Sequence, residues 1–294
     1  MRKRLLLSCV TLLVVACVWV SLALIPAPFA LLASRTASPP PSPVDTDTPT
    51  ATPTSGLIPT QTAENLPPEI AREMDKIQQQ VVELRGLAPR APLLRQLLTP
   101  EQLRKKVSED FFKDYSIEEA REDVLVMSVF GLLEPDYDLY TLYHELYSEQ
   151  VAGYYDDESK TMYVVQERDF LGPQRTTYAH EFIHAVQDQH YDMQGGLKLT
   201  DEYCEQDSEY CAAVSALIEG DASLSERVWL WNYATEEDRQ QIVEFYQGYQ
   251  SPVFDAAPNF LKEDFLFPYI QGLEFVESLY DLGGWQAIDA AYAD

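Results

Sequence analysis

The pattern H-E-x-x-H, formed by residues 180 to 184, constrains the fold of this chain more than any other stretch. Residues four apart on a helix lie on one face, about 6 Å apart along the axis. His180 and His184 could therefore close on one metal ion, and Glu181 flanks that face, where it can reach a water molecule beside the metal. Apolar residues recur at helical spacing around the motif. The pattern thus predicts a helix with two metal ligands, against the alternative of a surface helix with two incidental histidines.

A catalytic zinc site needs a third protein ligand, and His190 is one candidate. Its spacing from the motif matches the count that metzincins use. Metzincins, however, carry a glycine where this chain has Gln187, and they have a methionine turn beneath the site, whereas this chain has no methionine after Met193. On an uninterrupted helix His190 would point about 120° away from His184. Both departures count against His190.

Glu219 is the other candidate for the third ligand. It lies among apolar residues in an expected helix over residues 208–233. An acidic side chain on an apolar helix face is unfavourable unless it is paired or metal-bound. A glutamate from an antiparallel helix can complete a site with two histidines. The alternative for this stretch is a solvated helix face that also carries Asp221 and Glu226.

Two segments together resemble the gluzincin group of zinc metallopeptidases. Residues 180–188 carry the motif, and residues 216–222 read Ala-Leu-Ile-Glu-Gly-Asp-Ala. Gluzincins have H-E-x-x-H on one helix and a glutamate, often in a Glu-Gly-x-Ala setting, on the next. The stretch from residue 151 to 285 also resembles a little-characterised branch of secreted or membrane-anchored bacterial proteins of that type.

The resemblance implies Zn²⁺ as the cofactor, His180, His184 and Glu219 as its ligands, and Glu181 as the general base. In some relatives a downstream tyrosine or histidine stabilises the oxyanion, and Tyr269 is the candidate here. The chain departs from the best-known members in two ways. A longer stretch of 34 residues separates the second histidine from the glutamate, and Ser223 stands where those members have an aspartate. Asp221 is a doubtful substitute for that aspartate in orienting a ligand histidine.

The charge of the chain excludes one class of partner. The formal net charge is −27 at pH 7. Phosphate backbones bind to basic faces, so we expect no nucleic-acid partner. The same acidity argues against a membrane-surface role for the globular part. The resemblance to metallopeptidases implies a peptide or protein substrate as the partner of the site, and we expect contact with the membrane through the N-terminal segment only.

The first 65 residues of the chain form two compositional segments. Residues 1–33 carry a basic start followed by an apolar run without charge from Leu5 to Ala33, which predicts a transmembrane anchor or a signal segment. Basic residues before the run place the following domain outside the cytoplasm, in an anchored, secreted or lipid-anchored form. Residues 34–65 are rich in Pro, Thr and Ser, which is typical of a disordered tether. In such a compartment Cys204 and Cys211 are expected to form a disulfide, with metal ligation by these two thiols as the weaker alternative.

Residues 66–294 form the expected metallopeptidase-like domain, with a helical part (66–150) and a catalytic core (151–294). Short aromatic and β-branched runs at 151–155 and 161–165, separated by turn residues, predict a β-hairpin just before the motif helix. The predicted fold class is therefore α+β and mostly helical, with a small hairpin beside a zincin-like active-site helix and a second ligand-bearing helix. The chain stops inside an expected helix, which is compatible with a truncated C-terminus.

These observations predict a zinc-dependent peptidase that hydrolyses peptide bonds outside the cytoplasm, with Glu181 activating water. The alternative is a catalytically inactive, metalloprotease-like domain that serves as a binding or scaffold module at the cell surface. A third possibility is a latent enzyme whose helices before residue 151 cover the cleft.

Overall fold

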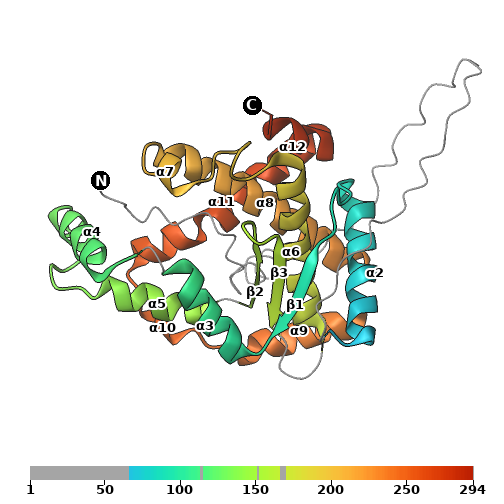
Figure 1. The fold of residues 1–294 in the computed structure, drawn as a ribbon, viewed down its shortest axis with the longest axis horizontal. Coiled ribbons are helices and arrows are strands. Elements are labelled where there is room, and N and C mark those ends of the chain that lie inside the picture. The colour runs from blue at the N-terminus through green and yellow to red at the C-terminus, as the bar shows by residue number, and fades with distance from the viewer. Residues whose placement is uncertain (1–65, 113–114, 151, 166–169, 294) are drawn as a thin grey trace, which may run out of the picture.

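The computed structural model describes residues 66–112, 115–150, 152–165 and 170–293 (Figure 1). The expected membrane or signal segment, residues 1–33, and the expected tether, residues 34–65, lie outside the described residues. Among the residues that the structure describes, no helix is both long enough and apolar enough to cross a membrane.

A small three-stranded sheet lies at the centre of a mostly helical fold, so the predicted fold class is confirmed. Strands β2 (Gly153–Asp156) and β3 (Thr161–Val165) form the predicted antiparallel hairpin. Strand β1 (Leu94–Leu98), which the sequence analysis did not predict, pairs in parallel with β3, and the strand order is β1-β3-β2. Strand β2 therefore lies at one edge of the sheet within the described part of the chain.

Several helices before the hairpin begin or end at residues that are typical helix caps. Helix α2 (Pro68–Arg85) ends at Gly86, whose φ of 83° is readily adopted by glycine. Two capping boxes begin the next helices: Thr99 opens α3 (Pro100–Phe111) and Ser116 opens α4 (Ile117–Val129). Helix α5 (Leu139–Gln150) completes this part.

The remaining helices follow the hairpin and include the two that carry the candidate ligands. They are α6 (Gly172–Tyr191), α7 (Asp201–Cys204), α8 (Ser208–Asn232), α9 (Glu236–Gly248), α10 (Pro252–Ala256), α11 (Asn259–Gly283) and α12 (Trp285–Ala291). Cys204 at the end of α7 is disulfide-bonded to Cys211 in the first turn of α8, as predicted, with their Cα atoms 5.6 Å apart.

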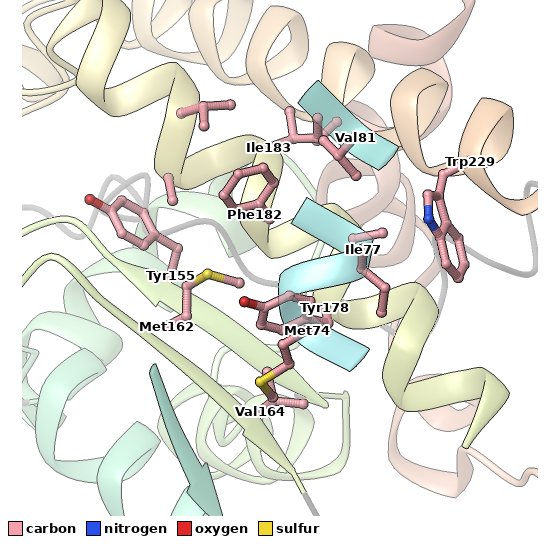
Figure 2. Close-up of a cluster of buried hydrophobic side chains, with 14 of the residues drawn as sticks. Met74, Ile77, Val81, Tyr155, Met162, Val164, Tyr178, Phe182, Ile183 and Trp229 are labelled. Atoms are coloured by element: carbon pink, nitrogen blue, oxygen red, sulfur yellow. The ribbon is translucent and has the colours of Figure 1, made fainter. Parts of the chain in front are cut away.

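Helix α6 runs through the main hydrophobic core (Figure 2). Phe182 and Ile183, within the motif, are buried in one cluster with Ile77 and Val81 of α2 and Met162 of β3. Burying a side chain of this size contributes roughly 1.5–3 kcal/mol. Because α2 and β1 come from the first part of the expected domain and α6 from the second, the two parts share one core and one sheet.

Two glycines bring α8 unusually close to α11. A Cβ atom added to Gly220 would overlap the carbonyl oxygen of Gly272, and one added to Gly272 would overlap the carbonyl oxygen of Ala216. Only glycine therefore permits this approach of the two backbones. Since Gly220 directly follows Glu219, the contact fixes α8 in the position from which Glu219 faces α6.

Candidate metal centre

The site lies between α6 and α8, which run antiparallel as expected. His180 in the first half of α6 contacts Glu226, late in the central part of α8, whereas Gln187 further along α6 contacts Ile218, earlier on α8. The helical spacing of the motif places both histidines on the side of α6 that faces α8. The described structure buries this face completely.

Three side chains converge between the two helices. The Nε2 atoms of His180 and His184 lie 3.3 and 3.4 Å from Oε2 of Glu219. One nitrogen from each ring and one carboxylate oxygen all lie within 4.8 Å of one another. These are the side chains that the sequence predicted as ligands, and their arrangement could hold a metal ion.

The outer nitrogen of each imidazole has a hydrogen-bond partner. Nδ1 of His180 lies 2.8 Å from Oε2 of Glu226, and Nδ1 of His184 lies 2.9 Å from Oε1 of Gln187. Both partners are oxygen acceptors, so each Nδ1 carries a proton and donates it. When either ring is neutral, its Nε2 therefore has a lone pair directed at the space beside Glu219, which is the tautomer that metal ligation requires.

The electrostatics of the cluster also fit a cation. Burial alone would lower the pKa of His180, but the carboxylates of Glu219 and Glu226 outweigh it and raise this pKa to about 10. Burial alone would raise the pKa of Glu219, but the two imidazoles outweigh it and lower this pKa to about 2. The carboxylate of Glu219 is thus buried in its ionised form against the two imidazole rings. Nε2 of His184 is buried without a hydrogen bond. A divalent cation would satisfy both the charges and this atom.

Glu181 is fully buried beside the ligand cluster. Neither of its carboxylate oxygens has a side-chain hydrogen-bond partner among the described residues. Burial raises the pKa of Glu181 to about 8, against the opposing effects of His180 and the nearby backbone of Tyr155. A buried carboxylate without a side-chain donor is the state expected of a group that acts on water or substrate.

The alternative reading of α8 as a solvated face is wrong. Glu219, Asp221 and Glu226 are all buried. Asp221 does not contact a ligand histidine directly, but accepts a hydrogen bond from Gln187, whose other amide atom contacts His184. The two side chains that orient the histidines are Glu226 and Gln187, and neither was predicted in this role.

A helical-spacing argument could have found Glu226. It follows Glu219 by seven residues, which is two turns on the same helix face. It contacts His180 from a position three residues beyond Ser223, where the best-known gluzincins have an aspartate. The hydroxyl of Ser223 is buried and has no partner among the described side chains.

The two remaining candidates are His190 and Tyr269. Helix α6 continues unbroken past Gln187, and Nε2 of His190 donates to the carbonyl oxygen of Ala88 at 2.8 Å. His190, the alternative third ligand, is therefore not part of the cluster. Tyr269 is buried on α11 in a second hydrophobic cluster with Tyr154 and Phe265. Its role in stabilising an oxyanion stays a prediction.

No family model, curated protein or solved structure matches the chain. The resemblance to gluzincins accordingly rests on the motif residues and on the geometry described above.

Proposed function

We propose that this chain is a zinc-dependent peptidase of the gluzincin type that hydrolyses peptide bonds outside the cytoplasm. The observation that carries the proposal is the convergence of His180, His184 and Glu219 within 4.8 Å, with Glu181 buried beside them. Two imidazoles and one carboxylate are the protein ligands of several catalytic zinc sites, which keep a fourth position open.

The donor set favours zinc over other common cations. Imidazole ligands suit zinc and other transition metals, whereas Mg²⁺ and Ca²⁺ prefer sites made wholly of oxygen atoms. When bound, Zn²⁺ would polarise the scissile carbonyl and lower the pKa of water towards ~7. Glu226 and Gln187 would hold the two imidazoles in the ligating orientation.

The proposed role of Glu181 is to accept a proton from the attacking water and pass it to the leaving amine. No described side chain donates a hydrogen bond to its carboxylate. A pKa raised by burial to about 8 suits a group that must both accept and release a proton near neutral pH.

A peptide substrate is supported by the strand beside this carboxylate. Strand β2 is an edge strand of the described sheet, and the backbone of its residue Tyr155 approaches Glu181. An extended peptide can add to such an edge through backbone hydrogen bonds, which would place a peptide bond near the site.

An extracytoplasmic location is supported by the disulfide between Cys204 and Cys211, since disulfides persist in oxidising compartments. The basic start and the apolar run within residues 1–33 agree with a domain held outside the cytoplasm by this segment.

One observation favours the alternative of a catalytically inactive binding or scaffold domain. His180, Glu181 and His184 are all fully buried, so a substrate can reach them only after the surrounding elements move apart. Metal binding without hydrolysis is what this alternative predicts.

The test compares the purified full chain with its E181Q variant. Zinc content is measured for both, and hydrolysis is followed on casein and on a peptide library. E181Q is expected to keep its zinc and to lose hydrolysis roughly 10²- to 10⁴-fold, while E209Q, an exposed position on α8, keeps both. Unchanged hydrolysis in E181Q would refute the mechanism, and zinc without hydrolysis in the unmodified chain would support the scaffold alternative.

A further inference from the structure

Gln187 is a fully buried amide whose orientation is fixed by its neighbours. Its Nε2 atom lies 3.0 Å from the carbonyl oxygen of Ile218 and 3.1 Å from Oδ2 of Asp221. A backbone carbonyl and a carboxylate can only accept hydrogen bonds, so the amide nitrogen has to face them. The amide oxygen of Gln187 consequently faces His184, whose Nδ1 lies 2.9 Å away.

This orientation selects one tautomer of His184. An amide oxygen accepts and cannot donate, so Nδ1 of His184 must carry the proton. Nε2 of the neutral ring then has a free lone pair on the side of Glu219. If the Gln187 amide were turned over, its nitrogen would face Nδ1, and the proton would move to Nε2, where it would block a metal.

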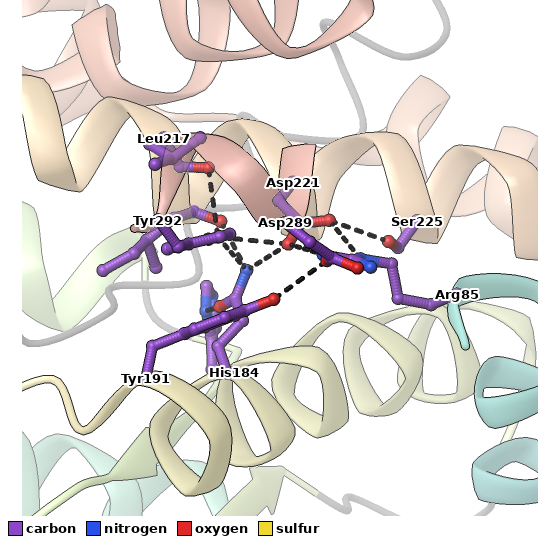
Figure 3. Close-up of polar contacts among 10 residues, drawn as sticks. Arg85, His184, Tyr191, Leu217, Asp221, Ser225, Asp289 and Tyr292 are labelled. Atoms are coloured by element: carbon purple, nitrogen blue, oxygen red, sulfur yellow. Dashed lines mark hydrogen bonds and ion pairs between the residues drawn. The ribbon is translucent and has the colours of Figure 1, made fainter. Parts of the chain in front are cut away.

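Asp221 is in turn held by a buried arginine (Figure 3). Nε and Nη2 of Arg85 lie 2.7 and 3.0 Å from the two carboxylate oxygens of Asp221. Nη2 of Arg85 also lies 2.7 Å from Oδ1 of Asp289, and the guanidinium carbon lies 4.9 Å from the centre of the Trp285 ring. Arg85 comes from α2, whereas Trp285 and Asp289 come from α12.

We propose that Gln187 is a positioning residue that sets the ligating tautomer of His184, and that Arg85, acting through Asp221, sets the orientation of Gln187. This inference rests on the proposed function, because a fixed tautomer matters only if Nε2 is a metal ligand. The chain Arg85–Asp221–Gln187–His184 spans three helices and links the first and last helices of the described structure to the candidate metal centre.

Stability alone does not account for this buried chain. Removing the charges of Arg85 and Asp221 from water is unfavourable, and well-packed apolar residues often replace such a buried ion pair without loss of stability. A carboxylate that must direct an amide nitrogen, by contrast, has no apolar substitute.

The test uses NMR on the metal-free full chain to observe the ring nitrogens of His184, at a pH where this ring is neutral. The chain has four histidines, so single substitutions assign each ring. The unmodified chain is expected to show a protonated Nδ1 and an unprotonated Nε2. Q187L is expected to lose this preference and to bind Zn²⁺ roughly 10- to 100-fold more weakly. The control Q189L changes a glutamine on the same helix that contacts the backbone of Arg90 and Ala91, and should leave both readouts unchanged.

D221N tests the second step and covers the case in which Q187L fails to fold. With the carboxylate of Asp221 replaced by an amide, the Gln187 nitrogen no longer faces an obligate acceptor at that position. Because the carbonyl of Ile218 still accepts from the Gln187 amide, the His184 population is expected to shift only in part toward the form protonated at Nε2, with weaker zinc binding than in the unmodified chain. An unchanged tautomer in both variants, or a protonated Nε2 in the unmodified chain, would overturn the inference. The NMR readout needs no metal, so a chain that binds no zinc would refute the proposed function and still decide this point.

Discussion

Oε2 of Glu226 lies 2.8 Å from Nδ1 of His180, two helical turns after Glu219 on the same helix. One helix therefore supplies both the candidate carboxylate ligand and the group that orients the first imidazole. A carboxylate that accepts the Nδ1 proton fixes the tautomer of the ring and raises its basicity as a ligand.

Removing the carboxylate of Glu226 should therefore weaken metal binding. E226L is expected to reduce zinc affinity roughly 10- to 100-fold, and E226Q by less, because an amide oxygen can still accept the Nδ1 proton. Calorimetric titration of the metal-free full chain with Zn²⁺ measures the effect, with E209Q as the exposed control on α8. Wild-type affinity in E226L would show that Glu226 does not act on the metal through His180.

The disulfide between Cys204 and Cys211 closes a short loop before α8. Its loss is expected to lower the free energy of unfolding by about 2 kcal/mol, at the low end of the usual range because the loop is short. Urea unfolding of the C204S/C211S variant, compared with the unmodified chain under oxidising and reducing conditions, measures this. Equal stability of the variant and the oxidised chain would contradict the expectation.

Asp238 is expected to make the stability of the chain depend on pH in the acid range. Burial alone would raise the pKa of Asp238, but hydrogen bonds from Thr235 and the charge of Arg175, whose Nη1 lies 2.7 Å away, outweigh it and lower this pKa. A lowered folded-state pKa stabilises the fold above the unfolded value of about 4. This stabilisation is lost as pH falls through the folded-state value.

D238N removes that pH-dependent contribution. The variant should be less stable than the unmodified chain by roughly 1 kcal/mol at pH 6, and the difference should shrink as pH falls below about 4. Denaturant unfolding at a series of pH values tests this, with D255N at an exposed position as the control. A difference that stays constant or grows toward pH 3 would show that the carboxylate of Asp238 is not the group responsible.

Residues 66–115 are expected to be part of the folded core rather than a removable cover. Four apolar side chains of α2 are buried in the same cluster as the motif helix, and Arg85 reaches Asp221. Deleting residues 66–115 from the full chain should therefore abolish cooperative thermal unfolding, whereas deleting the expected tether, residues 34–65, should leave the transition unchanged. A folded protein with increased hydrolysis after the first deletion would instead support a latent enzyme.

Local sequence signals were sufficient for much of the fold. The aromatic and β-branched run at 161–165 depends on neighbours within a few residues, as do the capping boxes of α3 and α4, and the structure confirms the predicted strand. Strand β1 was missed because its five residues, Leu-Arg-Gln-Leu-Leu, have little β-branched or aromatic character. Its parallel pairing with β3 joins segments more than sixty residues apart, which local patterns do not report.

For the site, too, local sequence patterns account for some of the contacts and not for others. The convergence of His180, His184 and Glu219 follows from helical spacing and the antiparallel packing of α6 and α8, both of which the sequence indicated. The contacts of Gln187 with Asp221, and of Asp221 with Arg85, depend on how α2 packs against α8, a tertiary arrangement that no local pattern encodes.

Zinc binding in two variants decides whether Glu219 is the third metal ligand. Zinc bound per chain, and its affinity, should be measured for the unmodified full chain, E219A and H190Q. We expect one zinc ion in the unmodified chain and the same in H190Q. E219A is expected to lose at least ~100-fold in zinc affinity, because its buried site keeps two imidazoles but lacks the third ligand. Full zinc binding in E219A, or its loss in H190Q, would contradict the assignment of Glu219 as the ligand that completes the site.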